Sequence, residues 1–414
     1  MDSEIKNRTS RYAERTGQFS IAALLALLPF HGITTLNEIL FFLSLSAFII
    51  IVLSNIAPLP GRFAPSKTLN ILIALSFVWG IITLVNAIDP NYSLHEITHK
   101  MSKHYILYFL AFQLVRLSQP VHTKMKWLLL PFIISAVLMS IYACYQFSLF
   151  PAMMENRVTG LTGRFYRFTV LLVLSFPLVV VSGILWRGWA KWVLLLSIPV
   201  ILTALFFTFT RAGWIAVMVE GFILAALFVK KYRKILFIGV ILATLLISVL
   251  AYRSADYKIL LVHGSEKPRM EAFFYSMEII RDNPVMGIGY GKKTFSRRYP
   301  QIYVKHAHNI FLNTAVELGI TGCIIFMAML FIIFKNFISS LRRESAFEQK
   351  VLLAGILTSI TGFLVLNLFD YMYHGWPGQI FWILTGMGFT LTYSGRADAN
   401  RAIHDKKSEN GIQM

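Results

Sequence analysis

The feature that most constrains this chain is its series of apolar runs, each close to the length that crosses a lipid bilayer. A transmembrane helix needs about 20 predominantly apolar residues. Hydrophobic residues make up 56% of the 414-residue chain and charged residues only 14%, whereas soluble domains carry about 25% charged residues. We therefore predict an all-α polytopic membrane protein.

The apolar runs predict about twelve transmembrane helices, of which the first, fourth and last are the weakest because they are short or carry polar residues. The expected spans cover residues 18–32, 36–56, 69–88, 103–118, 127–148, 166–186, 191–209, 212–229, 234–251, 310–335, 351–371 and 376–393. They divide the chain into nine spans within 1–251, a long loop at 252–309, three spans within 310–393 and a tail at 394–414.

The basic residues of the short loops predict an orientation. Short cytoplasmic loops are enriched in Lys and Arg, and every loop that a cytoplasmic N-terminus places inside is basic. We therefore expect both termini in the cytoplasm and the 252–309 loop on the outer, periplasmic side. That loop carries ten Lys or Arg against five Asp or Glu. Such charge attracts lipid-linked phosphates, although simple adhesion to anionic headgroups explains it as well.

The long loop is expected to contain short helices. Pro268 suits a first helical position, and apolar residues recur at helical spacing as far as Arg281. Asn283-Pro284 then ends the helix, and the glycines from Gly287 to Gly291 predict a tight turn. No strand precedes them, which argues against a nucleotide-binding loop and leaves a turn whose amides are available to an anion.

His306 and His308 stand at the mouth of the tenth span, just before the apolar run that begins at Ile310. Titratable groups at a bilayer boundary cost free energy and are usually functional. Neutral imidazole suits the removal of a proton from a sugar hydroxyl near pH 7. Helix capping is a simpler alternative. A zinc pair is another, but no third ligand stands nearby in the sequence, so we expect no metal ion and no cofactor.

Two arginines are expected on the same outer side. Arg211 joins two spans with almost no loop between them, and Arg269 begins the loop helix. The guanidinium group is a rigid fork of donors that matches phosphate oxygens. We predict that both arginines bind pyrophosphate. The alternatives are that Arg211 only snorkels from a helix end and that Arg269 is an ordinary surface residue.

Further polar groups are expected at this side. Asp370 ends the eleventh span, where it would orient an imidazole, pair with an arginine or simply belong to the interface. A separate basic cluster would meet headgroups or an anionic acceptor, and its members are Arg157, Arg164, Tyr166 and Arg167.

The order of four motifs resembles the O-antigen ligase family, which is grouped with O-antigen polymerases and bacterial O-oligosaccharyltransferases. The first two are Thr210-Arg211 between two spans, and Arg269 with Glu271-Ala272-Phe273 and the later Asn283-Pro284. The third, which is the most specific, is His308-Asn309 followed after nine residues by Gly319 and Gly322, and the last is Asp370. Together they cover roughly residues 205–375.

This resemblance implies a GT-C-like glycosyltransferase of the bacterial inner membrane. It would transfer glycan from an undecaprenyl-pyrophosphate donor to lipid A–core oligosaccharide at the periplasmic face, with inversion and without metal or nucleotide. His308 would be the general base, and Arg211 and Arg269 would hold the pyrophosphate. Supporting roles would fall to His306, Asn309 and Asp370. Membrane lipids would be the other partners, and no nucleic acid is implied.

Two alternatives remain open from the sequence. An O-antigen polymerase or a protein O-oligosaccharyltransferase would perform the same chemistry on another acceptor. A lipid-linked glycan transporter or flippase would place ionisable groups near the bilayer midplane and show repeated halves. The candidate groups here cluster at outer span ends instead, which favours the ligase.

Overall fold

The computed structural model describes residues 2–54, 66–117, 120–149, 157–228, 266–300 and 306–411. All regular structure in these ranges is helical, which confirms the all-α prediction. The α-helices are α1 Asp2–Leu27, α2 Thr34–Leu53, α3 Lys67–Ile82, α4 Pro90–Glu96, α5 Ser102–Arg116, α6 Val121–Leu149, α7 Phe165–Leu185, α8 Trp189–Phe207, α9 Arg211–Phe228, α12 Glu266–Asp282, α13 Thr294–Arg298, α14 Ile310–Arg343, α15 Phe347–Asn367 and α16 Trp376–Gly411. A 3-10 turn η1 (Thr83–Asn86) and a π-turn η2 (Ile97–Met101) flank α4.

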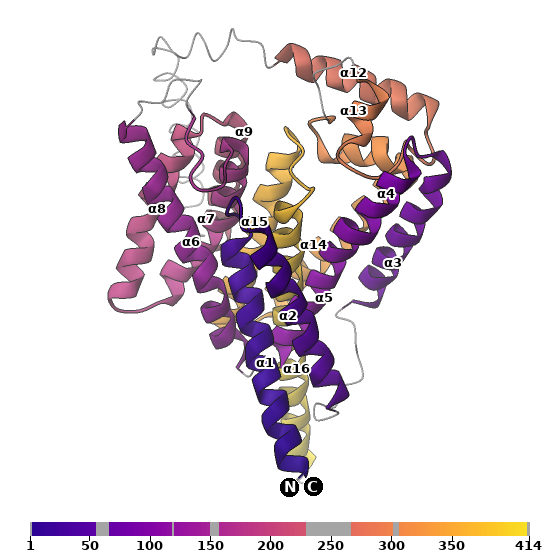
Figure 1. The fold of residues 1–414 in the computed structure, drawn as a ribbon. Helices are drawn as coiled ribbons and strands as arrows, with labels where there is room; N and C mark the ends of the chain where they lie inside the picture. Colours follow the sequence, from indigo (N-terminus) through magenta and orange to yellow (C-terminus); the bar gives the residue numbers. More distant parts are fainter. Residues whose placement is uncertain are drawn as a thin grey trace.

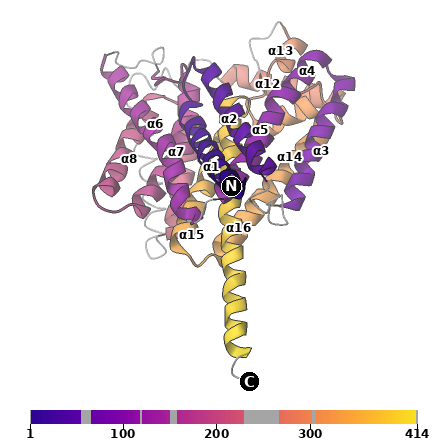
Figure 2. The ribbon, with the colours of Figure 1, turned by 60° about the horizontal axis from the view of Figure 1, so that its bottom comes forward.

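The helices form a bundle with two different ends. The loop helices α12 and α13 lie across one end, whereas the start of α1 and the end of α16 lie at the other (Figure 1). In both views α6, α7 and α8 lie to one side, α3 and α4 lie to the other, and α1, α2, α5 and α16 lie between them (Figures 1 and 2). The predicted loop helix is confirmed as α12, which ends immediately before Asn283-Pro284.

Eight helical segments of the described residues are long and apolar enough to cross a membrane, so the chain is a polytopic membrane protein. Each corresponds to one of the twelve predicted spans, and the eight are α2, α3 with η1, α6, α7, α8, α9, α14 and α15. The predicted span at 234–251 lies outside the described residues.

The three weakest predicted spans, 18–32, 103–118 and 376–393, fall on α1, α5 and α16, which are helical but not among the eight. α5 has only 15 residues and packs along α16. Its polar groups meet protein, because Lys103 forms a 2.6 Å ion pair with Glu38 and His104 Nε2 lies 3.3 Å from the Gly375 carbonyl oxygen. A helix enclosed by protein tolerates such groups where a lipid-facing helix does not.

α7 and α15 form the centre of the bundle. Within their membrane-spanning stretches 89% and 78% of the residues are buried, against 22% for α3 and 28% for α8. The outer helices therefore present apolar side chains outward, as expected of surfaces that face lipid, and examples are Ile71, Val78, Trp192 and Leu196.

α14 is broken near its start at Gly319, where φ is 72° and ψ is 177°. This backbone region is open essentially only to glycine. A break inside a membrane-embedded helix frees carbonyl and amide groups, and these must find other partners because lipid offers none.

The segment that follows α12 closes this break. Ile288 N and Gly289 N donate hydrogen bonds to the carbonyls of Val316 and Glu317, both at 3.0 Å. The predicted tight turn at Gly287–Gly291 is therefore present. The expectation that its amides face an anion is wrong for these two, because they bind the carbonyls of the broken helix.

Two further hydrogen bonds complete the closure. Ile320 N, just after the break, donates to the Pro284 carbonyl at 2.8 Å. The indole Nε1 of Trp79, from α3, donates to the Leu318 carbonyl at 2.9 Å. The break thus joins α3, α14 and the segment after α12 through groups that would otherwise be left unpaired.

The substitution Gly319→Ala tests how much depends on this close approach. Its Cβ would lie 1.9 Å from the Val285 carbonyl oxygen. Gly188, at the start of α8, has a similar backbone (φ 65°, ψ −148°) but open space around it, so Gly188→Ala controls for backbone strain. We expect Gly319→Ala to lower the free energy of unfolding by at least about 3 kcal/mol and Gly188→Ala by about 1–2 kcal/mol, measured by thermal melting in detergent. Equal losses would contradict the proposed steric role.

Candidate active site

A short segment at 306–309 carries both histidines to the start of α14. Asn309 caps this helix, because its Oδ1 accepts hydrogen bonds from Phe311 N at 2.9 Å and Leu312 N at 3.0 Å. Its Nδ2 donates to the Leu368 carbonyl at 3.0 Å. The cap is therefore Asn309 rather than a histidine, and it also ties the segment to the α15–α16 loop.

His308 has a left-handed backbone conformation, with φ +51°. This is uncommon for a non-glycine residue and costs about 1–3 kcal/mol. Neighbouring bonds maintain it: His308 N donates to His306 Nδ1 at 3.3 Å, and Ala307 N donates to Asn313 Oδ1 at 3.1 Å. Strain that the surroundings maintain is typical of a functional site.

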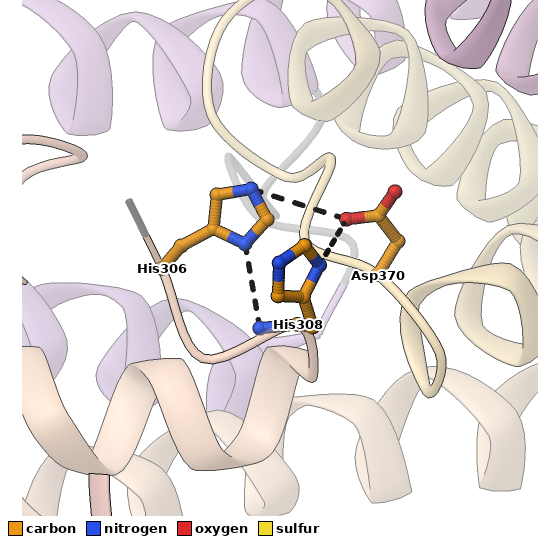
Figure 3. Close-up of side chains that lie close together, drawn as sticks. All are labelled: His306, His308 and Asp370. Atoms are coloured by element: carbon orange, nitrogen blue, oxygen red, sulfur yellow. Dashed lines mark hydrogen bonds and ion pairs between the residues drawn. The ribbon is translucent and has the colours of Figure 1, made fainter. Parts of the chain in front are cut away.

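Both imidazoles point toward one carboxylate, which the loop after α15 brings in (Figure 3). His308 Nδ1 lies 3.2 Å from Asp370 Oδ1, and His306 Nε2 lies 3.9 Å from the same oxygen. Tyr371 N donates to that oxygen at 2.8 Å. Of the three roles expected for Asp370, the geometry is that of an imidazole partner.

The surroundings fix the charges of these groups. Burial by itself raises the pKa of Asp370, but the His308 hydrogen bond, the nearby imidazoles and the Tyr371 amide bring that pKa below its usual value. Burial lowers the pKa of His306 to about 3, with a further contribution from His308. Near pH 7 the carboxyl of Asp370 is therefore ionised and His306 is neutral.

A cavity of about 590 Å³ opens beside the histidine segment. Its wall includes His308, Asn309 and Arg269, so residues from two of the predicted motifs share one space. The rest of the wall is apolar apart from one thiol, and consists of Phe273, Ala307, Phe311, Leu312, Ala315, Cys323, Leu368 and Phe369.

Arg157 lies within electrostatic range of two other arginines, one of which, Arg269, lines the cavity. The pKa of Arg157 is lowered by its burial and then by the charges of Arg211 and Arg269. Arg157 also stacks on the Phe165 ring, 4.5 Å from its centroid. From the sequence alone, Arg157 belongs to a separate cluster. Its approach to Arg211 and Arg269 depends on how α7 and α9 pack, which a local sequence pattern does not show.

Lys292 is a charged neighbour that the sequence did not single out beyond its place in a basic loop. Its pKa is lowered by burial and by the charges of Arg167 and Arg164, and its own charge lowers the pKa of His306. Arg164 and Arg167 of the predicted basic cluster therefore lie within electrostatic range of Lys292.

The comparison with known families bears on this geometry. Residues 193–327 match the sequence model of the family described as O-antigen ligase. This region, about a third of the chain, is similar to O-antigen ligases. The match confirms the resemblance and includes Arg211, Arg269, both histidines and Gly319. No curated protein matches the sequence.

Asp370 lies beyond the matched residues, yet it completes a group of three side chains that could bind a metal ion. The ligand atoms of His306, His308 and Asp370 all lie within 4.8 Å of one another. No third ligand stands near the histidines in the sequence, but the fold supplies Asp370, which lies 62 residues after His308 along the chain. Two imidazoles and a carboxylate suit Zn²⁺, so a cation has to be tested alongside a general base.

The lowered pKa of His306 predicts a pH dependence of stability. Its folded pKa lies below the unfolded value of about 6.5, so between the two the unfolded chain binds the extra proton and stability falls as pH falls. His306→Gln removes this linkage. The loss of unfolding free energy from pH 7 to pH 5 should be about 1–2 kcal/mol smaller in His306→Gln than in the wild type.

Melting curves at the two pH values measure this difference. His99→Gln, at an exposed histidine of η2, is the matched control and should follow the wild type. An unchanged pH dependence in His306→Gln would show that His306 is not held neutral in the fold.

Proposed function

We propose that this enzyme is an O-antigen ligase that transfers a glycan from an undecaprenyl-pyrophosphate donor to the lipid A–core oligosaccharide. The observation that carries the proposal is that the Asp370-bound His308 and the guanidinium side chain of Arg269 belong to one cavity. A base for the acceptor hydroxyl and a cation for the leaving pyrophosphate are the two groups that such a transfer requires.

His308 would act as the general base. Since its Nδ1 faces Asp370, Nε2 is the nitrogen left for the substrate. Nε2 takes the proton of the acceptor hydroxyl while the hydroxyl oxygen forms a bond to the anomeric carbon. The bond from that carbon to the pyrophosphate oxygen breaks, its electron pair leaves with the pyrophosphate, and the configuration inverts. Asp370 stabilises the imidazolium that results.

The arginines would hold the leaving group. Arg211 and Arg269 carry fixed positive charge and forked donors that match phosphate oxygens, and the proximity of both to Arg157 supports a shared anion. The mutual repulsion of three guanidinium groups is relieved when a pyrophosphate lies between them. The apolar wall formed by Phe273, Phe311 and Leu312 would accommodate the first isoprene units of the carrier.

We place the site at the periplasmic face of the bacterial inner membrane, with both termini in the cytoplasm and no cofactor. Two observations support this orientation. The site lies at the α12 end of the bundle, opposite the start of α1 (Figure 1). The basic α7–α8 and α14–α15 connections, with Arg187 and Arg343, are the kind expected inside. The division into 1–251, 252–309, 310–393 and 394–414 follows, with twelve spans in a GT-C-like arrangement.

A transporter of lipid-linked glycan is the candidate of another class, and one residue favours it. Glu220 is fully buried within α9, and neither of its carboxylate oxygens has a hydrogen-bond partner among the described residues. Intramembrane carboxyls often mark transport pathways. The ligase is preferred because His306, His308 and Arg269 lie instead at the α12 end of the bundle, in a loop or near a helix start. Movement of labelled lipid-linked glycan across liposomes by purified protein, lost in Glu220→Gln, would support transport.

His308→Ala is expected to lower the rate of glycan transfer by about 10²–10⁴-fold, because it removes the base. The assay uses purified protein, a defined undecaprenyl-pyrophosphate glycan and lipid A–core, with EDTA present. His99→Ala, at an exposed histidine, should retain the wild-type rate. Near-normal transfer by His308→Ala would remove the base from the mechanism.

The same assay separates the remaining alternatives. Transfer abolished by EDTA and restored by Zn²⁺ would make His306, His308 and Asp370 a metal site. Transfer to free glycan or to protein, but not to lipid A–core, would identify a polymerase or a protein O-oligosaccharyltransferase.

Arg211→Lys keeps the charge but loses the forked donor geometry. We expect transfer efficiency to fall about 10–100-fold, the equivalent of one charge-assisted hydrogen bond. Arg281→Lys is the control, because the Arg281 side chain is 77% exposed at the end of α12. Wild-type efficiency in Arg211→Lys would indicate that this arginine only anchors the end of a helix.

A further inference from the structure

A second acid–imidazole pair lies buried beside the first. His374 Nε2 lies 3.0 Å from Glu317 Oε1, and the two side chains are only 5% and 3% exposed. Asn313, one turn earlier on α14, donates from Nδ2 to the same carboxylate oxygen at 2.7 Å. The sequence alone assigns no role to these three residues, because nothing in the local pattern distinguishes them from other helix and loop residues.

The group reaches the catalytic segment through the backbone. Asn313 Oδ1 accepts the hydrogen bond from Ala307 N, which is the amide between the two histidines and next to the strained His308. Glu317 fixes the amide end of Asn313, so the opposite end of that side chain has one orientation available. The Glu317 carboxylate, which lies about two turns into α14, thus fixes the position of Ala307 N through Asn313.

The two acid–imidazole pairs join the same two segments with opposite polarity. In one pair the imidazole, His308, precedes α14 and the acid, Asp370, lies in the α15–α16 loop. In the other the acid, Glu317, lies on α14 and the imidazole, His374, lies in that loop. Two connections hold the loop against α14 in both position and angle, which a single connection does not.

The cost of burial argues that this second pair serves more than stability. Taking a carboxylate and an imidazole out of water costs free energy, and well-packed apolar residues in place of a buried pair are often as stable or more so. Each member is also enclosed: the rings of Tyr290 and Tyr371 lie 5.0 Å and 5.1 Å from the ring of His374. Such groups are useful where a site has to be held in one geometry.

We propose that Glu317, Asn313 and His374 form a positioning network that fixes the backbone at Ala307 and so aims the His308 imidazole at Asp370 and at the acceptor hydroxyl. The proposal rests on His308 being the general base of the proposed ligase. Its members touch neither donor nor acceptor, and they act on the reaction only through the segment at 306–309.

Asn313→Leu tests the connection to Ala307. We expect kcat to fall about 100-fold with KM within about twofold of the wild type, because substrate binding is kept and the base is displaced. Hydrogen–deuterium exchange should become faster in the 306–309 segment, which loses an amide partner. Asn336→Leu, the same change further along α14, is the matched control and should alter neither quantity. Wild-type kcat and exchange in Asn313→Leu would overturn the proposal.

Because a single change at the pair leaves a buried charged or polar group alone, Glu317→Leu and His374→Leu are each expected to melt at lower temperature. The double variant Glu317→Leu/His374→Leu removes both and should recover much of that loss. Its kcat should remain near that of Asn313→Leu, since Asn313 has lost its anchor. Wild-type kcat in the double variant would show that the pair is only structural.

The exchange measurement separates this proposal from the proposed function. If His308→Ala transfers glycan normally, the ligase mechanism fails whatever the network does. If His308→Ala is inactive while Asn313→Leu keeps wild-type kcat and wild-type exchange, the base stands and the positioning network is wrong.

Discussion

The hydrogen bonds that close the break in α14 hold the segment after α12 against that helix. An unbroken helix would satisfy its own carbonyls and leave Ile288 N and Gly289 N without these partners. At Gly319 the carbonyls of Val316 and Glu317 turn instead to amides of the 284–289 segment. In a membrane such exchange is nearly obligatory, since an unpaired backbone group in hydrocarbon costs several kcal/mol. The break therefore acts as a docking point for the segment after α12.

The placement of charge follows from the same constraint. The eight described spans carry few charges. The charged and titratable groups of the candidate site lie in loops or helix ends beyond these spans, and they are His306, His308, Asp370, Arg269 and Lys292. Positive charge gathered there would attract a lipid-linked pyrophosphate that diffuses in the plane of the membrane.

Much of this could be predicted from the sequence, and the failures have physical causes. The lengths of the apolar runs predict eight of the spans. The spacing of apolar residues and the Asn283-Pro284 pair predict α12, because the local pattern determines these elements. The role of Asp370 as an imidazole partner, by contrast, depends on how the α15–α16 loop folds back. No local sequence pattern indicates the Glu317–His374 pair, because the partner of an acid in an apolar helix is determined only by the tertiary structure.

The docking point also explains how His308, the proposed base, and Arg269, the proposed phosphate-binding residue, come to share a cavity. Arg269 lies on α12, whose end continues directly into the segment bound at the α14 break. His308 lies just before the first turn of the same α14, and Glu317 contributes its carbonyl to the docking bonds and its side chain to Asn313. Glu317 thus links the loop that carries the arginine to the amide that orients the histidine.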